Sequence, residues 1–332
     1  AASAGTPVRI VSGSNTQDIT VGTDWIGRAT YTANGTEMTV YGDIIGFDCS
    51  SNGANLTAID PSHNTQLEIL YCSSNQLSSL DVSHNTQLTE LYCSSNQLSS
   101  LDISHNTQLT ELYCWGNNLS SLDLSTNTQL TELYCYENKL TSLDVSGCTQ
   151  LDILNCYDNK LSSLDVSGCT QLTELRCSKN RLSKLDISKN TQLTYLNCSG
   201  NNLSNLDLSQ NTQLTELYCG SNNLSSLDVS GCTQLSTLLC YGNNFSTQAL
   251  DAIYCALPDR TGNDNGLIEP VKNSSDPNHA TVLATNKQNA TTKNWRVQYY
   301  RNNADIATTG TYVCGTVHLD TYITLTVPTE RR

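Results

Sequence analysis

Apolar and polar residues follow one another along most of this chain in a pattern that repeats every 21 residues. In one copy the apolar positions are Leu88, Leu91, Cys93, Leu98 and Leu101. The middle of each copy alternates apolar and polar residues with a period of two, which predicts a short strand. In that strand Leu91 and Cys93 would point inward. The outward positions would be Glu90, Tyr92 and Ser94.

This repeat predicts a solenoid of stacked coils. Six inward side chains contribute roughly 10 kcal/mol of apolar burial per coil, whereas ordering costs about 1.5 kcal/mol for each residue. One coil therefore cannot fold alone, and stacking is needed to bury both of its faces. The apolar positions match the leucine-rich repeat pattern, with cysteine in the third leucine position. We expect an α/β repeat fold: a right-handed leucine-rich repeat solenoid of ten coils over residues 44–243, with a parallel β-sheet on its concave face.

Both ends of the chain depart from the repeat. Residues 1–43 contain the alternating stretches ATYTA and MTVYG, which predict a β-rich N-terminal cap. Residues 244–300 predict an α/β C-terminal cap, in which a helix begins after Ser246 and ends before Pro258. The stretches GLIEPV and WRVQYY, with a helical segment between them, would continue this cap. Residues 301–332, which contain TYVC and YITLTVP, predict a β-like tail.

The cysteines form a ladder rather than a disulfide framework. Nine of them lie 21 residues apart, and Cys49 joins the series after a two-residue insertion; the nine are Cys72, Cys93, Cys114, Cys135, Cys156, Cys177, Cys198, Cys219 and Cys240. Parallel side chains on strands about 4.8 Å apart are too widely spaced at Cβ for a disulfide. A linear row also cannot converge on zinc. We therefore expect reduced cysteines that act as small hydrophobic residues.

Five cysteines lie outside this ladder. Cys148, Cys169 and Cys232 replace asparagine in a later turn of the repeat, and we expect them to be inward and reduced as well. Cys255 and Cys314 lie beyond the repeats, and a bond between these two remains open.

Two further ladders accompany the cysteines. The asparagine that follows each strand, Asn96 in one copy, would satisfy backbone groups inside the coil. In all nine copies an aspartate in the later turn is followed, after one residue, by Ser-x-Asn-Thr or Ser-x-Cys-Thr, which favours an Asx-type turn; a row of calcium sites is the alternative. These aspartates are Asp60, Asp81, Asp102, Asp123, Asp144, Asp165, Asp186, Asp207 and Asp228.

The outward strand positions gather aromatic residues. A first column contains Tyr71, Tyr92, Tyr113, Tyr134 and Tyr218, and a second contains Trp115, Tyr136, Tyr157 and Tyr241. Tyrosine here could reflect β propensity alone. Exposed Tyr and Trp are also enriched at recognition surfaces, because a rigid ring with a polar tip offers contact area at low entropic cost. With these nine residues we place Arg176, Tyr195, Glu90, Glu111 and Glu132 in a candidate binding surface.

Charge narrows the possible partners. The formal net charge is −14 and the pI is about 4.6, which disfavours nucleic acid as a partner. A short basic column, Lys139, Lys160 and Arg181, lies near Lys179 and Arg176; it is either a solvated edge or a surface that orients an acidic partner.

No apolar run is long enough to span a membrane. The chain lacks an initiator Met and a signal-type segment, as expected for a mature secreted product or a trimmed chain.

Catalysis is not expected. Glu90, Glu111 and Glu132 align about 4.8 Å apart, a spacing similar to the carboxylate pair of retaining glycosidases. An open sheet without a pocket gives none of them the desolvation that such chemistry needs. The sequence contains no catalytic triad, phosphate loop or converging metal ligands, so we expect no enzyme activity, no cofactor and no metal.

The 21-residue phrase LTELYCSSNQLSSLDVSHNTQ, with its cysteine ladder, resembles the bacterial internalin family over residues 44–243. It is also similar to leucine-rich surface proteins of gut and oral anaerobes, in which a helix such as TQALDAIYCALPDRTG and a closing NWRV follow the repeats. The resemblance implies an extracellular, cell-surface protein whose concave face binds a host or matrix partner. The printed sequence has no L-P-x-T-G sorting motif, so it does not support wall anchoring.

Two functional hypotheses follow. The first is a secreted or surface-exposed binding protein, monomeric and not membrane-spanning, that recognises a host protein, glycoprotein or glycan through the concave aromatic residues. The second is a structural spacer within a cell-surface protein.

Overall fold

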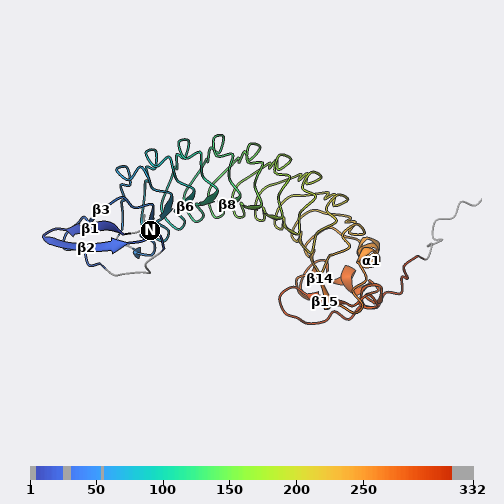
Figure 1. Cartoon of the computed structure of the whole chain (residues 1–332). Coiled ribbons are helices and arrows are strands. Elements are labelled where there is room, and N and C mark those ends of the chain that lie inside the picture. The colour runs from blue at the N-terminus through green and yellow to red at the C-terminus, as the bar shows by residue number, and fades with distance from the viewer. Residues whose placement is uncertain (1–4, 25–30, 54–55, 316–332) are drawn as a thin grey trace, which may run out of the picture.

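The computed structural model describes residues 5–24, 31–53 and 56–315. Figure 1 shows an arc of stacked coils with the strands on its inner side, a β hairpin at the N-terminal end and a small helical unit at the other end. Twelve parallel strands form one sheet whose spatial order, β15 to β4, follows the chain. The predicted leucine-rich solenoid with a parallel concave sheet is therefore confirmed.

Ten strands of the sheet come from the repeats. They are β4 Gly46–Asp48, β5 Ile69–Tyr71, β6 Glu90–Tyr92, β7 Glu111–Tyr113, β8 Glu132–Tyr134, β9 Ile153–Asn155, β10 Glu174–Arg176, β11 Tyr195–Asn197, β12 Glu216–Tyr218 and β13 Thr237–Leu239. Neighbouring strands pair in register, so Leu91 pairs with Leu112. Leu91 and Cys93 are fully buried, whereas Glu90 and Tyr92 are half-buried on the other face. The predicted alternation is confirmed at these positions.

An asparagine ladder ties each coil to the next. Asn96 donates through Nδ2 to the carbonyls of Cys93 in its own coil and of Cys72 in the preceding coil, at 3.0 Å each. Its Oδ1 accepts the backbone N–H of Leu77 at 2.9 Å. The predicted structural role is confirmed. It extends across coils, because two of these three bonds reach the preceding coil.

The aspartate ladder forms Asx turns. Asp123 Oδ1 accepts the backbone N–H of Ser125 at 2.9 Å, and each of the other eight aspartates accepts the equivalent serine N–H. The hydrogen bonds from Ser125 lower the pKa of Asp123. Among the described residues, no three or more His, Cys, Asp or Glu side chains form a group that could hold a metal. The turn interpretation is confirmed.

These turns predict acid-sensitive stability. A carboxylate whose pKa is lowered in the folded state contributes stability above its unfolded pKa of about 3.9, and this contribution is lost as the pH falls through the folded pKa. We expect the thermal midpoint to decrease below about pH 4. A triple Asp123→Asn, Asp144→Asn, Asp165→Asn variant keeps an oxygen acceptor that does not titrate. It should lose less stability than the wild type between pH 5 and pH 3, and equal losses would contradict the prediction.

The ladder cysteines are free thiols packed inside the coils. Thirteen cysteines are free; all are buried except Cys49, which is half-buried. Burial raises the thiol pKa values, for example that of Cys114 to about 12. In the later turn, the Cys169 thiol donates to the Val145 carbonyl at 3.4 Å. In coils that have asparagine at this position, a side-chain amide makes the equivalent hydrogen bond, as Asn127 does. The prediction of inward, reduced cysteines is confirmed.

Thiol reactivity should report this burial. A thiol reagent is expected to modify at most Cys49 in the folded protein and all thirteen free cysteines after denaturation, because a buried, protonated thiol is a poor nucleophile. Mass spectrometry of the two samples measures the number of adducts. Stoichiometric labelling of Cys114 or Cys135 without denaturant would contradict the buried ladder.

The N-terminal cap is a small antiparallel sheet. The strands β1 Thr6–Ser12 and β2 Asn15–Val21 form a hairpin, and β3 Thr39–Tyr41 pairs with the other edge of β1. The strand predicted in MTVYG is therefore present. In ATYTA, residues 29–30 lie outside the described residues and residues 31–33 form no strand.

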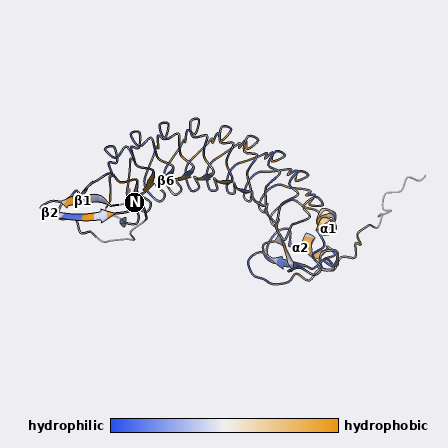
Figure 2. Cartoon of the chain, viewed as in Figure 1, coloured by the Kyte–Doolittle hydropathy of each residue, from blue (hydrophilic) through white to orange (hydrophobic). Residues whose placement is uncertain are grey.

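The C-terminal cap contains the predicted helix. The helix α1, Thr247–Ala256, begins at Ser246, whose hydroxyl accepts the Ala249 N–H at 3.1 Å, and it buries Leu250, Ile253 and Tyr254. Figure 2 shows α1 as largely hydrophobic. The remaining elements are β14 Gly266–Val271, α2 His279–Leu283, α3 Gln288–Thr291 and β15 Trp295–Tyr299, so GLIEPV and WRVQYY do extend the sheet.

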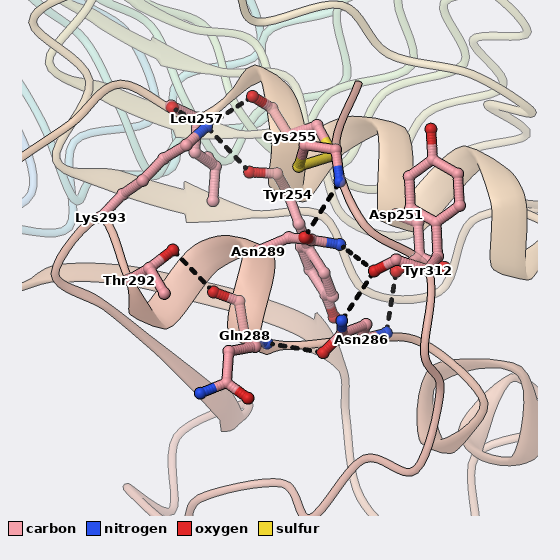
Figure 3. The surroundings of a disulfide bond; sticks show 11 residues. Asp251, Tyr254, Cys255, Leu257, Asn286, Gln288, Asn289, Thr292, Lys293 and Tyr312 are labelled. Carbon is pink, nitrogen blue, oxygen red and sulfur yellow. Dashed lines mark hydrogen bonds between the residues drawn. A yellow bond between two sulfur atoms is a disulfide. The ribbon is translucent and has the colours of Figure 1, made fainter. Parts of the chain in front are cut away.

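The end of the described chain differs from the predicted β-like tail. TYVC, residues 311–314, forms no strand. Its backbone binds the cap instead, because the Tyr312 carbonyl accepts the side-chain amides of Asn286 at 2.7 Å and Asn289 at 3.0 Å (Figure 3). Cys314 forms a disulfide with Cys255 of α1. YITLTVP lies outside the described residues.

Candidate functional site

The concave face carries a stack of four tyrosines. Tyr71, Tyr92 and Tyr113 lie on consecutive strands, and their ring centroids are 4.2 and 4.1 Å apart with interplanar angles of 10° and 8°. Tyr134 continues the stack at 4.4 Å, tilted by 54°. The in-register pairing of β5 to β8 produces this column, because each coil places its tyrosine at the same strand position. The ring faces cover one another, so the ring edges are what the column presents to solvent.

A glutamate from the next coil holds each of the first three tyrosine hydroxyls. Tyr71 donates to Glu90, Tyr92 to Glu111, and Tyr113 to Glu132, the last at 2.5 Å. Burial, and then this hydrogen bond, raise the pKa of each tyrosine, so the hydroxyls remain protonated donors. Each of these three hydrogen bonds therefore joins two neighbouring coils and uses one of the two carboxylate oxygens.

The second aromatic column lies beside the first. Trp115 stacks on Tyr136 at 4.9 Å and 5°, and Tyr136 stacks on Tyr157 at 4.8 Å and 20°. The Tyr157 hydroxyl donates to Glu137. The Lys179 ammonium lies 5.7 Å from the centre of the Tyr157 ring, a cation–π contact that the sequence interpretation did not identify. Together the two columns span coils two to six.

The other candidate residues belong to a separate group farther along the sheet. Arg176 donates to Glu174, and its guanidinium lies 4.3 Å from the Tyr195 ring centre. Tyr195 occupies the strand position that glutamate holds in neighbouring coils, and it packs at 5.2 Å against Tyr218. Asn155 and Asn197, in the first-column position, separate Tyr134 from Tyr218. Tyr195 and Tyr218 thus lie apart from the N-terminal tyrosine stack, whereas the charge of Arg176 acts on Tyr134 at the end of that stack.

Tyr241 is covered rather than presented. It is only 8% exposed, and its ring packs against that of Tyr300 at 4.2 Å with a tilt of 37°, a contact that the sequence did not reveal. Its ring lies over Gly220, where an added Cβ would approach the ring to 2.9 Å. Tyr241 therefore packs the C-terminal end of the sheet and is not an accessible member of the second column.

Ser94 was predicted to face outward but is only 2% exposed. Its short side chain lies among larger neighbours, and the next coil places Trp115 in the same column. Its hydroxyl is buried without a hydrogen-bond partner in the described structure. Ser94 is therefore not a contact residue of this surface.

The stacked coils and their motif define a leucine-rich repeat protein. The family model for leucine-rich repeats matches residues 86–127 and 128–168. The functional domain of InlJ from Listeria monocytogenes, described as including a cysteine ladder, is 44% identical with a TM-score of 0.61; the match covers 64% of this chain and 47% of that chain. The repeats are thus of the internalin type.

Two other solved structures share the fold. A leucine-rich repeat protein of Leptospira interrogans is 26% identical, with a TM-score of 0.59, over 64% of this chain and 58% of that one. The internalin InlF from Listeria monocytogenes is 22% identical, with a TM-score of 0.53; the match covers 59% of this chain and 68% of that chain. The chain spans about half the length of the first two matched structures. No curated protein matches the chain.

The proteins that this chain resembles share a general functional role. Leucine-rich repeat proteins of the internalin type are protein-binding and adhesion modules, and their fold is typically a scaffold without enzyme activity. Within the described ranges, no helix is long and apolar enough to cross a membrane.

Proposed function

We propose that the chain is an extracellular, non-enzymatic binding protein that recognises a host or matrix protein or glycan through the two aromatic columns of its concave face. The observation that carries this proposal is the pair of stacks on an open sheet, Tyr71 to Tyr134 and Trp115 to Tyr157. Contiguous exposed aromatic surface marks interaction sites more often than scattered residues do.

Two features support the proposal. The tyrosine–glutamate hydrogen bonds hold the surface in one arrangement, so little side-chain entropy remains to be lost when a partner binds. The Cys255–Cys314 disulfide supports an extracellular location, because disulfides persist mainly in oxidising compartments.

An array of host glycans, glycoproteins and matrix proteins tests the proposal. A Tyr113→Ala, Trp115→Ala, Tyr136→Ala variant is expected to bind the partner at least tenfold more weakly than the wild type, because it interrupts both stacks. Tyr41→Ala removes an exposed tyrosine of the N-terminal cap and is the matched control. Equal binding by wild type and triple variant would remove this site.

A structural spacer is the second candidate. It is favoured by the uninterrupted asparagine ladder, which links every coil through buried hydrogen bonds. The same array separates the two functions, since a spacer would bind none of the partners through the concave face.

A further inference from the structure

The cations of the solenoid are confined to three coils. Residues 44–243 contain seven Lys and Arg residues, and all of them lie between Lys139 and Lys189. The solenoid before Lys139 carries none, although the whole chain has a net charge of −14. Coils five to seven therefore carry cations that the other coils of the solenoid lack.

Three of these cations form a row next to the second aromatic column. Lys139 and Lys160 lie three residues after Tyr136 and Tyr157, and Arg181 holds the same position in the next coil. The backbone N–H of each donates to the leucine carbonyl of the preceding coil, at 2.8 Å in all three cases. Successive members are thus one coil apart, about 4.8 Å by the spacing of parallel strands.

The row is exposed and unpaired. Lys139, Lys160 and Arg181 are exposed, and none has a carboxylate within salt-bridge distance among the described residues. The equivalent positions in coils two and three hold the neutral Gln76 and Gln97.

The nearest acidic groups are already engaged. Asp158 pairs with Lys179 at 3.3 Å, Glu137 accepts the Tyr157 hydroxyl, and Glu174 accepts Arg176. Each of these three carboxylates therefore has a partner outside the row. The three cations of the row remain available to a ligand.

From this arrangement we propose that coils five to seven bind a linear acidic glycan, whose chain runs along the solenoid axis with its carboxylate or sulfate groups on Lys139, Lys160 and Arg181. This inference rests on the proposed binding function and names its ligand class. A regular row of single charges fits a polymer with repeating single anions. The neighbouring Trp115, Tyr136 and Tyr157 offer ring edges for contact with sugar rings, and Tyr136 also offers a hydroxyl group.

Nucleic acid fits the same surface poorly. Binding a phosphate backbone draws on many Lys and Arg contacts, and this row supplies three in an acidic protein.

Calorimetric titration of the full chain with hexasaccharides tests this inference. A heparin-type hexasaccharide carries sulfate and carboxylate, a galacturonate hexamer carries carboxylate alone, and cellohexaose is neutral. We expect an acidic hexamer to bind at least tenfold more tightly than cellohexaose, with affinity that decreases as salt increases. The difference in affinity between the two acidic hexamers identifies which anion, sulfate or carboxylate, the protein recognises.

The decisive variant is Lys139→Gln, Lys160→Gln, Arg181→Gln, because glutamine already occupies this position in coils two and three. It should lose at least tenfold in affinity at an unchanged thermal midpoint. The matched control, Lys184→Gln, Lys189→Gln, Arg296→Gln, removes the same charge outside the row and should bind normally. Equal losses in both variants, or none in the first, would overturn the inference, as would equal affinity for single-stranded DNA or polyglutamate.

Failure of this inference is separable from failure of the proposed function. The glutamine variant leaves every aromatic residue in place. If no acidic hexamer binds but the tyrosine variant still loses its array partner, only the acidic-glycan inference fails. If the hexamer binds through the row while the tyrosine variant keeps its array partner, only the aromatic site fails.

Discussion

Replacing Asn117 with alanine is expected to destabilise the solenoid by roughly 3–6 kcal/mol, since several buried polar groups lose their partner at once. Asn117 Nδ2 donates to the carbonyls of Cys93 at 3.1 Å and Cys114 at 3.0 Å, and its Oδ1 accepts the Leu98 N–H at 2.9 Å. Each buried donor or acceptor left unpaired costs about 1–3 kcal/mol. Because these hydrogen bonds join neighbouring coils, the substitution weakens the interface between coils, and solenoid cooperativity depends on that interface.

Urea unfolding followed by circular dichroism measures this effect. Asn118→Ala is the matched control, because Asn118 is the exposed neighbour of Asn117 and should change stability by no more than about 0.5 kcal/mol. The Asn117→Ala variant should also bind its partner less tightly, since Trp115 of the second aromatic column lies two residues before it. Equal midpoints for the two variants would show that water or backbone adjustment replaces the asparagine.

The repeat makes most of this fold predictable. A fixed 21-residue period sets the coil length, so one correct interpretation of Leu91, Cys93 and Asn96 applies to every coil. The in-register sheet, the free cysteines and the Asx turns all follow from it. Even the hydrogen bond between Tyr92 and Glu111 has a sequence signal. Residues 21 apart pair on adjacent strands, so Glu111, which is 19 residues after Tyr92, lies two residues before the strand partner of Tyr92.

The exceptions arise where the repeat stops or where side-chain size varies from coil to coil. Ser94 has the strand position of Trp115, yet its short side chain is buried whereas the indole is half-exposed. Tyr241 is covered by Tyr300, which lies 59 residues later in a cap without periodicity. Alternation predicts which face a side chain occupies. It does not predict what a neighbouring element places over that face.

Removing the Cys255–Cys314 disulfide is expected to destabilise the C-terminal cap by about 4 kcal/mol, the chain-entropy value for a loop of this length. The two cysteines are separated by 59 residues, and the bond joins α1 to the end of the described chain. Around the bond, the Cys314 N–H donates to Asn289, and the Lys293 ammonium donates to the carbonyls of Cys255 and Leu257 (Figure 3). The segment before Cys314 thus closes over the helices of the cap.

The consequence should extend to the edge strand of the sheet. The backbone of residues 304–306 pairs with β15, the last strand of the sheet: Tyr299 donates to the Ala304 carbonyl, and Ile306 donates to the Val297 carbonyl, at 3.0 Å each. Releasing Cys314 removes the covalent link that holds this segment in place, so the edge of a twelve-stranded sheet becomes available for pairing with other chains. A Cys255→Ser, Cys314→Ser variant should therefore unfold earlier and also aggregate at lower temperature.

Hydrogen exchange distinguishes this account from a general loss of stability. In the double serine variant, or in wild type treated with a reductant, the amides of β15 and of residues 304–310 should exchange faster while those of β6 to β8 keep their protection, because each coil contacts only its neighbours. A uniform increase along the solenoid would contradict a local clasp. Unchanged exchange at β15 would mean that the hydrogen bonds of Asn286 and Asn289 to Tyr312 hold the segment without the disulfide.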